Sequence, residues 1–470
     1  MTDATDHITA AHAPPRVGFV SLGCPKATVD SERILGELTQ AGYAIATDYQ
    51  GADVVVVNTC GFIDAAREES FDAIDEALNE HGRVVVTGCL GAEHALLQAR
   101  FPELLAVTRP HDYAAVLAAV KRAAPIPAGC DPIAQTALRG DARLPLTPPH
   151  YAYLKVSEGC NHSCRFCIIP SMRGPLVSRD LNGVVREAER LVDSGVREIL
   201  VIAQDLSAYG VDLGYARTTL LGQAVETRFE TLCRALDGLG VWVRLHYVYP
   251  YPHVDAVIPL MRHDGLLPYL DIPLQHGAPR VLKAMRRPAA AEHTLERIQG
   301  WRTQNPDLVI RSSFIVGFPG ETEADFMTLL DFLDEAALDR VGCFQYSPVA
   351  GAAANALPNH VSPEEMQARY DALMAHQKAI SARRIARLVG RELDVLVDEV
   401  DGERVIGRSY ADAPDIDGQV YVSFEEDAPA VGSLVRVRID ASDDYDLWGH
   451  TVGAARPYAS ASLTTVDQPR

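Results

Sequence analysis

Three cysteines stand close together in one short segment, at Cys160, Cys164 and Cys167. Gaps of three and then two residues let three thiolates of one loop bind the same metal centre without help from distant parts of the chain. An iron–sulfur cube usually takes four ligands, so three leave one iron open, and an open position is typical of catalytic metal sites. The alternative is a structural zinc site, with His162 or a distant residue as the fourth ligand.

A second set of cysteines, Cys24, Cys60 and Cys89, is widely spaced along the chain. Each follows a run of residues typical of a buried strand: 17–21, 53–58 and 83–87. The carboxyl ends of parallel strands meet at one edge of a sheet, where such folds bind ligands and where helix N-termini favour thiolates. The pattern therefore predicts a second three-cysteine metal centre, again with an open iron.

The remaining three cysteines show no comparable setting. We interpret Cys130 as a linker residue, and Cys233 and Cys343 as thiols of the hydrophobic core, where a buried cysteine is usually inert.

The elements that must position the second set lie in residues 14–125. The three runs above and a fourth at 104–107 alternate with helical patterns at 31–41, 65–80 and 91–100. Strand–helix repetition of this kind predicts an α/β fold with an open, doubly wound parallel sheet. A stretch rich in Pro, Ala and Gly follows and is typical of a linker, which we place at 126–148.

The first cysteine loop directly follows the first strand of a longer β/α series, in a predicted domain at 149–385. Six strand candidates are at 152–157, 197–203, 241–248, 269–274, 308–316 and 341–346. Helical patterns separate them near 180–194, 226–238, 253–263, 278–303 and 322–336. Six β/α units in series favour a partial (β/α)6 barrel with its chemistry at the C-terminal strand ends. Asp271, Gln275 and His276 stand at one such end and are candidates for lining a substrate cavity, although structural hydrogen bonding explains them equally well.

A third predicted domain occupies 386–453, before a tail at 454–470. Ser362, followed by Pro and Glu, is a good helix start, and the helix is expected to reach Leu388. Five short strand patterns follow, at 392–399, 403–409, 419–424, 434–440 and 446–452. A module of this size predicts a small five-stranded barrel of the oligonucleotide-binding type.

Length, charge and hydrophobicity narrow the class of protein. The 470 residues allow several domains, and neither an apolar run long enough to span a membrane nor a secretory signal is visible. Nine cysteines without an export signal favour thiols in a reducing compartment, and we expect a cytoplasmic protein without a membrane partner. A net charge of −20 argues against general nucleic-acid binding and favours a basic partner.

The segment around Cys160, Cys164 and Cys167 resembles the signature loop of the radical S-adenosylmethionine (SAM) superfamily, including an aromatic residue, Phe166, before the third cysteine. The resemblance implies a [4Fe-4S] cluster whose open iron binds SAM and cleaves it to a radical. The segment 315–321 is similar to the superfamily's cofactor-contacting glycine strand. The cofactor contacts that the resemblance suggests are Phe166, Gln204, Arg311, Ser313 and Gly317.

Over about residues 14–455 the chain resembles the methylthiotransferases, in motifs such as SLGCPKATVDSE, NTCGFIDAAREES and SEGCNHSCRFCIIPSMRGPLVSR. The resemblance implies a second [4Fe-4S] cluster on Cys24, Cys60 and Cys89, a C-terminal TRAM domain and two uses of SAM. One SAM methylates a cluster-associated sulfur, and the other generates the radical that lets a methylthio group be installed on an unactivated carbon. A low-potential electron donor, such as flavodoxin or ferredoxin, is implied as a partner.

Two branches of this family differ in substrate. One modifies an adenosine derivative beside the tRNA anticodon, and the other modifies the β-carbon of an aspartate in small-subunit ribosomal protein twelve. Residues 386–453 hold six Arg, no Lys and sixteen Asp or Glu, a net of −10 that would repel RNA and attract a basic protein, free or in the ribosome. This charge and the SMRGPLVSR loop favour the protein-modifying branch over the tRNA branch. A non-catalytic, zinc-stabilised scaffold or ribosome-assembly factor is a third hypothesis.

Overall fold

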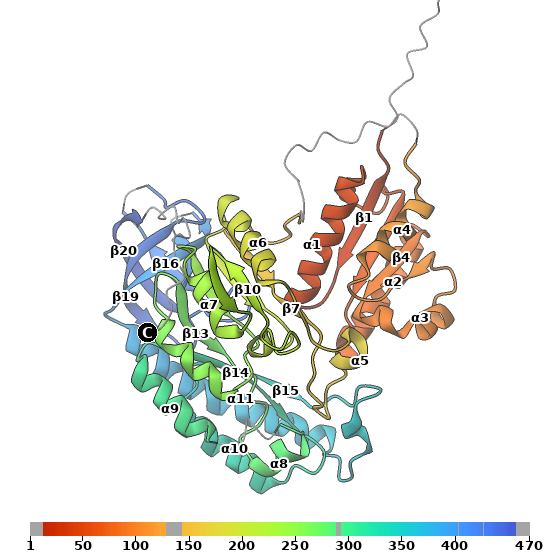
Figure 1. The fold of residues 1–470 in the computed structure, drawn as a ribbon. Helices are drawn as coiled ribbons and strands as arrows, with labels where there is room; N and C mark the ends of the chain where they lie inside the picture. Colours follow the sequence, from red (N-terminus) through yellow and green to blue (C-terminus); the bar gives the residue numbers. More distant parts are fainter. Residues whose placement is uncertain (1–12, 128–142, 288–292, 403, 426, 457–470) are drawn as a thin grey trace, which may run out of the picture. The chain divides into compact units, whose positions relative to one another are not determined.

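The computed structural model describes residues 13–127, 143–287, 293–402, 404–425 and 427–456 (Figure 1). It divides into two compact units, of which the first comprises 1–146 with 168–174 and the second 147–167 with 175–470. Cys130, much of the predicted linker and nearly all of the predicted tail lie outside the described residues. Within the described part, no helix is both long and apolar enough to cross a membrane.

The first unit is built on a five-stranded parallel sheet of order β2-β1-β3-β4-β5, and the predicted doubly wound sheet is confirmed. The strands are β1 (Arg16–Ser21), β2 (Ala44–Ile45), β3 (Val54–Thr59), β4 (Val84–Gly88) and β5 (Ala106–Val107). The valines of β3 and β4 are fully buried because helices cover both faces of the sheet.

Two apolar cores, one on each face, hold the helices of this unit. One contains residues of α1 (Pro25–Gln40) and α4 (Tyr113–Ala123), and the other contains residues of α2 (Asp64–Glu80) and α3 (His94–Arg100). Helix α1 begins six residues earlier than predicted, because Pro25 occupies its first turn. Strand β2 and helix α4 were not predicted; β2 has only two residues, and α4 runs directly into the Pro-, Ala- and Gly-rich stretch that we interpret as a linker.

The second unit contains a six-stranded parallel sheet in sequence order, and the predicted six-unit β/α array is confirmed. Its strands are β6 (Tyr151–Lys155), β9 (Glu198–Ile202), β12 (Trp242–Leu245), β13 (Leu266–Asp271), β14 (Val309–Val316) and β15 (Arg340–Gln345). The covering helices include α6 (Leu181–Asp193), α7 (Phe229–Asp237), α10 (Glu323–Ala336) and α11 (Pro363–Ile385). Ser362 caps α11 as predicted, through a bond of 3.2 Å from the Glu365 backbone N–H to its hydroxyl.

Two predicted helices of this unit are wrong in detail. The segment 253–263 contains two short 3-10 turns, Pro252–Ala256 and Ile258–Leu260, because Pro259 cannot donate the backbone hydrogen bond of a continuous helix. The segment 278–303 contains separate helices, α8 (Pro279–Ala284) and α9 (Thr294–Gln304). An unpredicted hairpin, β10 (Arg217–Leu220) with β11 (Gln223–Glu226), precedes α7.

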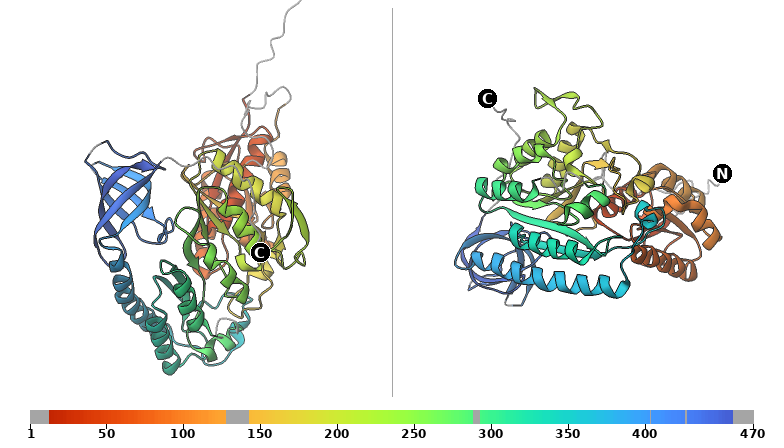
Figure 2. Two further views of the ribbon diagram at one scale, coloured as in Figure 1. Left: turned by 60° about the vertical axis from the view of Figure 1, so that its left-hand side comes forward. Right: turned by 90° about the horizontal axis from the view of Figure 1, so that it is seen from below.

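The C-terminal strands close into a barrel of order β16-β17-β18-β20-β19, so the predicted five-stranded barrel is confirmed. They are β16 (Glu392–Asp401), β17 (Arg404–Ser409), β18 (Val420–Ser423), β19 (Leu434–Ser442) and β20 (Leu447–Arg456). The long helix α11 leads into this barrel (Figure 2).

The barrel is joined to the parallel sheet of the same unit through a shared core. Trp242, Leu267 and Val309 of the sheet belong to the same apolar cluster as the interior valines of the barrel. Buried ion pairs reinforce the junction, because Glu198 of β9 lies between Arg244 of β12 and Arg408 of β17. The barrel therefore forms one compact unit with the sheet.

Candidate metal centres

The three cysteines of the first unit follow three neighbouring strands. Cys24 comes after β1 and is the N-cap of α1, Cys60 directly follows β3, and Cys89 directly follows β4. The register pairs Ser21 with Asn58 and Thr59 with Gly88, so all three strands end at the same edge. The predicted placement of these cysteines at one sheet edge is therefore found in the structure.

At this edge the backbone before Cys24 lies so close to Cys60 that the position requires a glycine. Gly23 has a φ of +98°, and a Cβ there would lie 3.0 Å from Cys60 Cβ and 3.3 Å from Cys60 Sγ. The chain before Cys24 thus runs directly against Cys60.

The thiols of this set influence one another. Burial raises the pKa of Cys89 to about 11, and the thiolates of Cys24 and Cys60 contribute to the same rise. Burial also raises the pKa of Cys60, with a further contribution from Cys24. For Cys24, burial is outweighed by the charges of Lys26 and Arg173 and by backbone N–H groups, so its pKa is lowered. A metal centre binds cysteine as the thiolate, and an iron centre bound by all three sulfurs would supply the positive charge that stabilises this form.

An arginine from a distant part of the sequence reaches this set. Arg173, in α5 (Ile169–Arg173), belongs to the first unit although it lies only six residues after Cys167. Its Nε donates to Cys89 Sγ at 3.2 Å, and its Nη2 donates to Asp30 Oδ2, also at 3.2 Å. We did not predict Arg173 or Asp30 as site residues; the only sequence signal was their position inside the quoted methylthiotransferase motifs.

The cysteine loop of the second unit follows β6 and the short strand β7 (Ser157–Glu158). The His162 backbone N–H donates to Cys160 Sγ at 3.4 Å, and the Cys167 backbone N–H donates to the Cys164 carbonyl at 3.2 Å. Burial raises the pKa of Cys160 to about 11, with contributions from Asp205 and Cys164. The loop is therefore compact, and two of its thiols interact. All eight described cysteines of the chain are free thiols, as metal binding requires.

A pocket opens beside Cys160, lined by His162, Asp205 and Tyr251 among others. His162 Nε2 lies 2.8 Å from Asp205 Oδ2 and 3.1 Å from the Tyr251 hydroxyl, and its ring stacks on Tyr249. Asp205 and Tyr251 thus hold the Nε2 side of the His162 ring, and the zinc alternative that uses this residue would need its Nδ1 atom. Asp205 is a pocket residue that we missed; the prediction chose its neighbour, Gln204.

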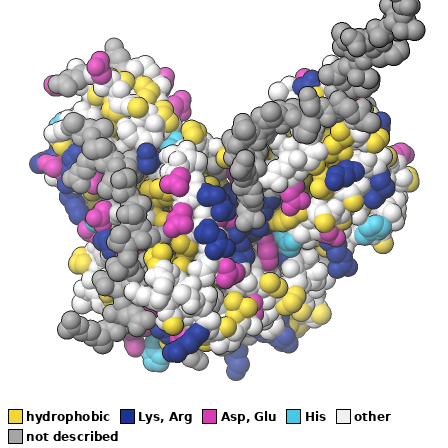
Figure 3. All heavy atoms as spheres, turned by 45° about the horizontal axis from the view of Figure 1, so that its top comes forward, with side chains coloured by type: hydrophobic (Ala, Val, Ile, Leu, Met, Phe, Trp, Pro, Cys, Tyr) yellow, Lys and Arg dark blue, Asp and Glu magenta, His cyan; other side chains and the backbone are white. Residues whose placement is uncertain are grey.

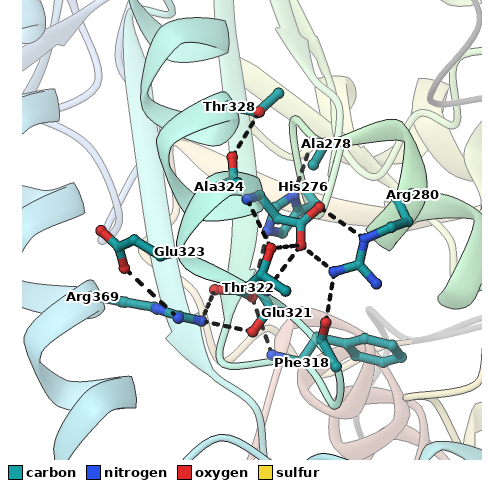
Figure 4. A network of polar contacts seen from close by, with 12 residues as sticks. His276, Ala278, Arg280, Phe318, Glu321, Thr322, Glu323, Ala324, Thr328 and Arg369 are labelled. Atoms are coloured by element: carbon teal, nitrogen blue, oxygen red, sulfur yellow. Dashed lines mark hydrogen bonds and ion pairs between the residues drawn. The ribbon is translucent and has the colours of Figure 1, made fainter.

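The glycine turn at 317–321 is held by a buried polar network (Figure 4). Glu321 accepts from the Phe318 backbone N–H at 3.2 Å and from Arg369 Nη1 at 2.8 Å. His276 Nδ1 accepts from a backbone N–H, which leaves a proton on Nε2, 3.4 Å from Glu321. His276 is thus a structural residue of this network. Gly317 itself has a φ of +73°, and a Cβ there would overlap Met366.

The other suggested cofactor contacts lie in different surroundings. Phe166 packs against the cluster that contains Phe318, so the cysteine loop and the glycine turn share one apolar core. Gln204 Nε2 reaches Glu158 at 3.4 Å. Arg311 forms ion pairs with Asp271 at 3.1 Å and with Asp417 at 3.5 Å, and these pairs hold its guanidinium in place. Ser313 and Arg311 lie on one face of β14, both about equally close to Gly342.

Some acidic residues of the C-terminal barrel are used inside the molecule. Asp398 pairs with Arg408, Asp412 with Arg340, and Asp417 with Arg311. On the face drawn in Figure 3, acidic side chains lie singly or in small groups among basic and apolar ones. The acidic surface open to a partner is therefore smaller than the net charge of this module indicates.

Three family models match the chain, one for each part. An uncharacterized protein family, UPF0004, matches residues 16–107, the Radical SAM superfamily matches 154–333, and the TRAM domain matches 389–452. Among solved structures, the radical SAM methyltransferase TsrM from Kitasatospora setae has a TM-score of 0.52 at 13% identity, over 78% of this chain and 89% of that one. This likeness supports the fold. Together with the cysteine loop, these matches define a radical SAM enzyme.

Curated relatives specify the family. The ribosomal protein uS12 methylthiotransferase RimO of Bordetella pertussis is 59% identical over 438 residues, which cover 93% of this chain and 99% of the relative. That of Stutzerimonas stutzeri is 60% identical over 439 residues, with the same coverage. The chain belongs to the RimO family of methylthiotransferases. The predicted enzyme class and its cofactors, SAM and [4Fe-4S] clusters, are thereby confirmed.

Proposed function

We propose that this protein adds a methylthio group to the β-carbon of an aspartate in ribosomal protein uS12, and that each cysteine triad holds one [4Fe-4S] cluster. The cluster that cleaves SAM is assigned to Cys160, Cys164 and Cys167, and the second to Cys24, Cys60 and Cys89. The observation that carries the proposal is the presence of two separate triads of free thiols, each at C-terminal strand ends of its own parallel sheet.

When bound, the clusters and SAM supply the electron, the radical and the methylated sulfur. The chain's own groups hold and orient them. We assign Phe166, Gln204, Ser313 and Gly317 to the surroundings of SAM, because the cysteine loop and the glycine turn share a core. Asp205 and Tyr251 fix the orientation of His162 at the pocket beside Cys160. We also keep Arg311 among the proposed SAM contacts, with its guanidinium oriented by the ion pairs to Asp271 and Asp417.

The substrate class follows from the family and from charge. The relatives' names specify uS12, and the acidic excess of the C-terminal barrel suits a basic protein better than RNA. We propose that the enzyme meets this substrate in the cytoplasm and receives electrons from a low-potential donor such as flavodoxin or ferredoxin. We keep the domain boundaries 14–125, 149–385 and 386–453 as part of the proposal.

The test is anaerobic reconstitution with iron and sulfide, followed by incubation with SAM, a low-potential reductant and either uS12 or unmodified tRNA. Mass analysis should find one methylthio group on the uS12 aspartate, and no modification with the Cys89→Ala variant. Modification of tRNA but not of uS12 would establish the tRNA branch instead. Bound zinc without cleavage of SAM would establish the scaffold hypothesis.

A further inference from the structure

Each cysteine triad has one buried arginine that donates to its least exposed thiol. In the first unit Arg173 Nε lies 3.2 Å from Cys89 Sγ, and in the second unit Arg287 Nη1 lies 3.5 Å from Cys164 Sγ. Arg173 is 7% exposed and Arg287 is 6% exposed. A guanidinium group stays charged even when it is buried, so each triad has a permanent positive charge at one sulfur.

The guanidinium of Arg173 is fixed from the other side by an acidic residue. Asp30 accepts from Arg173 Nη2 at 3.2 Å and from the Tyr113 hydroxyl at 2.6 Å. His111 Nε2 lies 3.3 Å from Arg173 Nη1, and His111 has a φ of +66°, a backbone strain that the surroundings must support. The cation is therefore held in one place, and Asp30 places a carboxylate on its other side.

Such a charge has a specific effect on an iron–sulfur cluster. Adding an electron increases the negative charge of the cluster, so a nearby cation or a hydrogen bond to sulfur makes reduction easier, and a nearby anion makes it harder. Arg173 provides both favourable features at Cys89. Asp30 accepts a hydrogen bond from Arg173, and its negative charge should make reduction of the cluster harder.

We propose that Arg173 is a positioning residue that sets the reduction potential of the second cluster, and that Asp30 tunes its effect in the opposite direction. The proposal rests on the assignment of that cluster to Cys24, Cys60 and Cys89. It gives α5 a role: this segment directly follows the first cysteine loop in sequence and delivers the charge to the other triad.

The experiment isolates the second cluster in the full-length chain by changing Cys160, Cys164 and Cys167 to Ala. The midpoint potential of the remaining cluster is then measured by a redox titration followed by electron paramagnetic resonance. Arg173→Gln should shift the potential to a more negative value, and Arg173→Lys should shift it less. Asp30→Asn should shift it in the opposite direction. Arg287→Gln is the matched control and should leave it unchanged.

Opposite shifts in the Arg173→Gln and Asp30→Asn variants support the proposal, because a merely structural role gives no such reversal of sign. Unchanged potentials, or shifts of one sign, overturn it. If the Arg173→Gln variant binds no iron, the Asp30→Asn variant decides alone. A less negative midpoint potential then supports the proposal, and an unchanged potential overturns it. A background variant without iron would refute the second cluster and this proposal together, and the iron content distinguishes that result from an unchanged potential.

Discussion

The Tyr269 hydroxyl donates a hydrogen bond of 2.6 Å to Asp417, and this bond joins the central strand β13 to the C-terminal barrel. Beside it, Arg244 donates to the backbone carbonyl of Tyr410 at 2.7 Å. Both contacts lie beside the apolar cluster that the sheet and the barrel share. The barrel is thus an integral part of the enzyme's core.

The buried Glu198 should be a major stabilising residue of this junction. Burial alone would raise its pKa, but Arg408 and Arg244 hold it below the usual range. Glu198→Gln leaves two buried guanidinium groups short of a charge and should cost about 3–5 kcal/mol of unfolding free energy. Urea unfolding followed by tryptophan fluorescence measures the loss, because Trp242 lies in the shared core.

Glu230→Gln is the control for this experiment. Glu230 forms a half-exposed pair with Arg234 one helical turn away, and its loss should cost less than about 1 kcal/mol. Equal costs for the two variants would contradict a special role of the buried pair.

The glycine turn offers a second prediction. Gly317→Ala should weaken the binding of SAM and destabilise the protein by roughly 1–3 kcal/mol, because the alanine needs a positive φ and overlaps Met366. Isothermal titration with SAM and thermal unfolding measure the two effects. Gly320→Ala is a control for the positive φ alone, since a Cβ there meets nothing within 4 Å. Met366→Ala should partly restore the stability of Gly317→Ala, because it removes the side chain that the alanine overlaps.

Asp271 should contribute to acid stability. Its pKa is about 2, because the hydrogen bond from His246 and the charge of Arg311 outweigh the effect of burial. The usual Asp value is about 3.9, so the folded state gains roughly 2–3 kcal/mol from this group above about pH 4, and the gain is lost as the pH falls towards 2. The Asp271→Asn variant should therefore lose stability at neutral pH and show a weaker decline between pH 4 and 2. Asp264→Asn, at a side chain that is 83% exposed, should follow the parent curve.

The two triads should be separable by iron analysis. Cys164→Ala should abolish cleavage of SAM while about half of the iron remains, held by the other triad. Cys89→Ala should likewise remove about half of the iron but leave cleavage of SAM intact. Cys233→Ala is the control, because this fully buried thiol lies in the hydrophobic core and should leave the iron content unchanged.

Local patterns predicted most of the scaffold and the position of the cysteines. The runs 54–57 and 84–86 are apolar on both faces, as is typical of a strand that is covered on both sides. A cysteine a few residues after such a run is therefore expected at the edge of the sheet. The elements that failed carry weak or mixed signals. Strand β2 has only two residues, and Pro259 interrupts a pattern that otherwise suits a helix.

The polar partners of the site could not be predicted in this way. Arg173 lies in a segment that reads as part of the barrel domain, and no local pattern states that this segment folds with the first unit. The family resemblance predicts Arg311 as a cofactor contact, but its pairing with Asp417 depends on a strand-to-barrel contact across about one hundred residues and has no local signal. Gln204 and Asp205 are neighbours in sequence, and only the backbone direction decides which of them reaches His162.

The segment 168–174 also limits how the protein can be divided. A fragment that stops at Leu146 contains Cys24, Cys60 and Cys89 but lacks the guanidinium that contacts one of them. A complementary fragment that starts at Thr147 carries this helix without the sheet on which it folds. No single cut in the polypeptide therefore yields two complete halves, and an isolated N-terminal domain would need the peptide grafted back to have its full set of contacts.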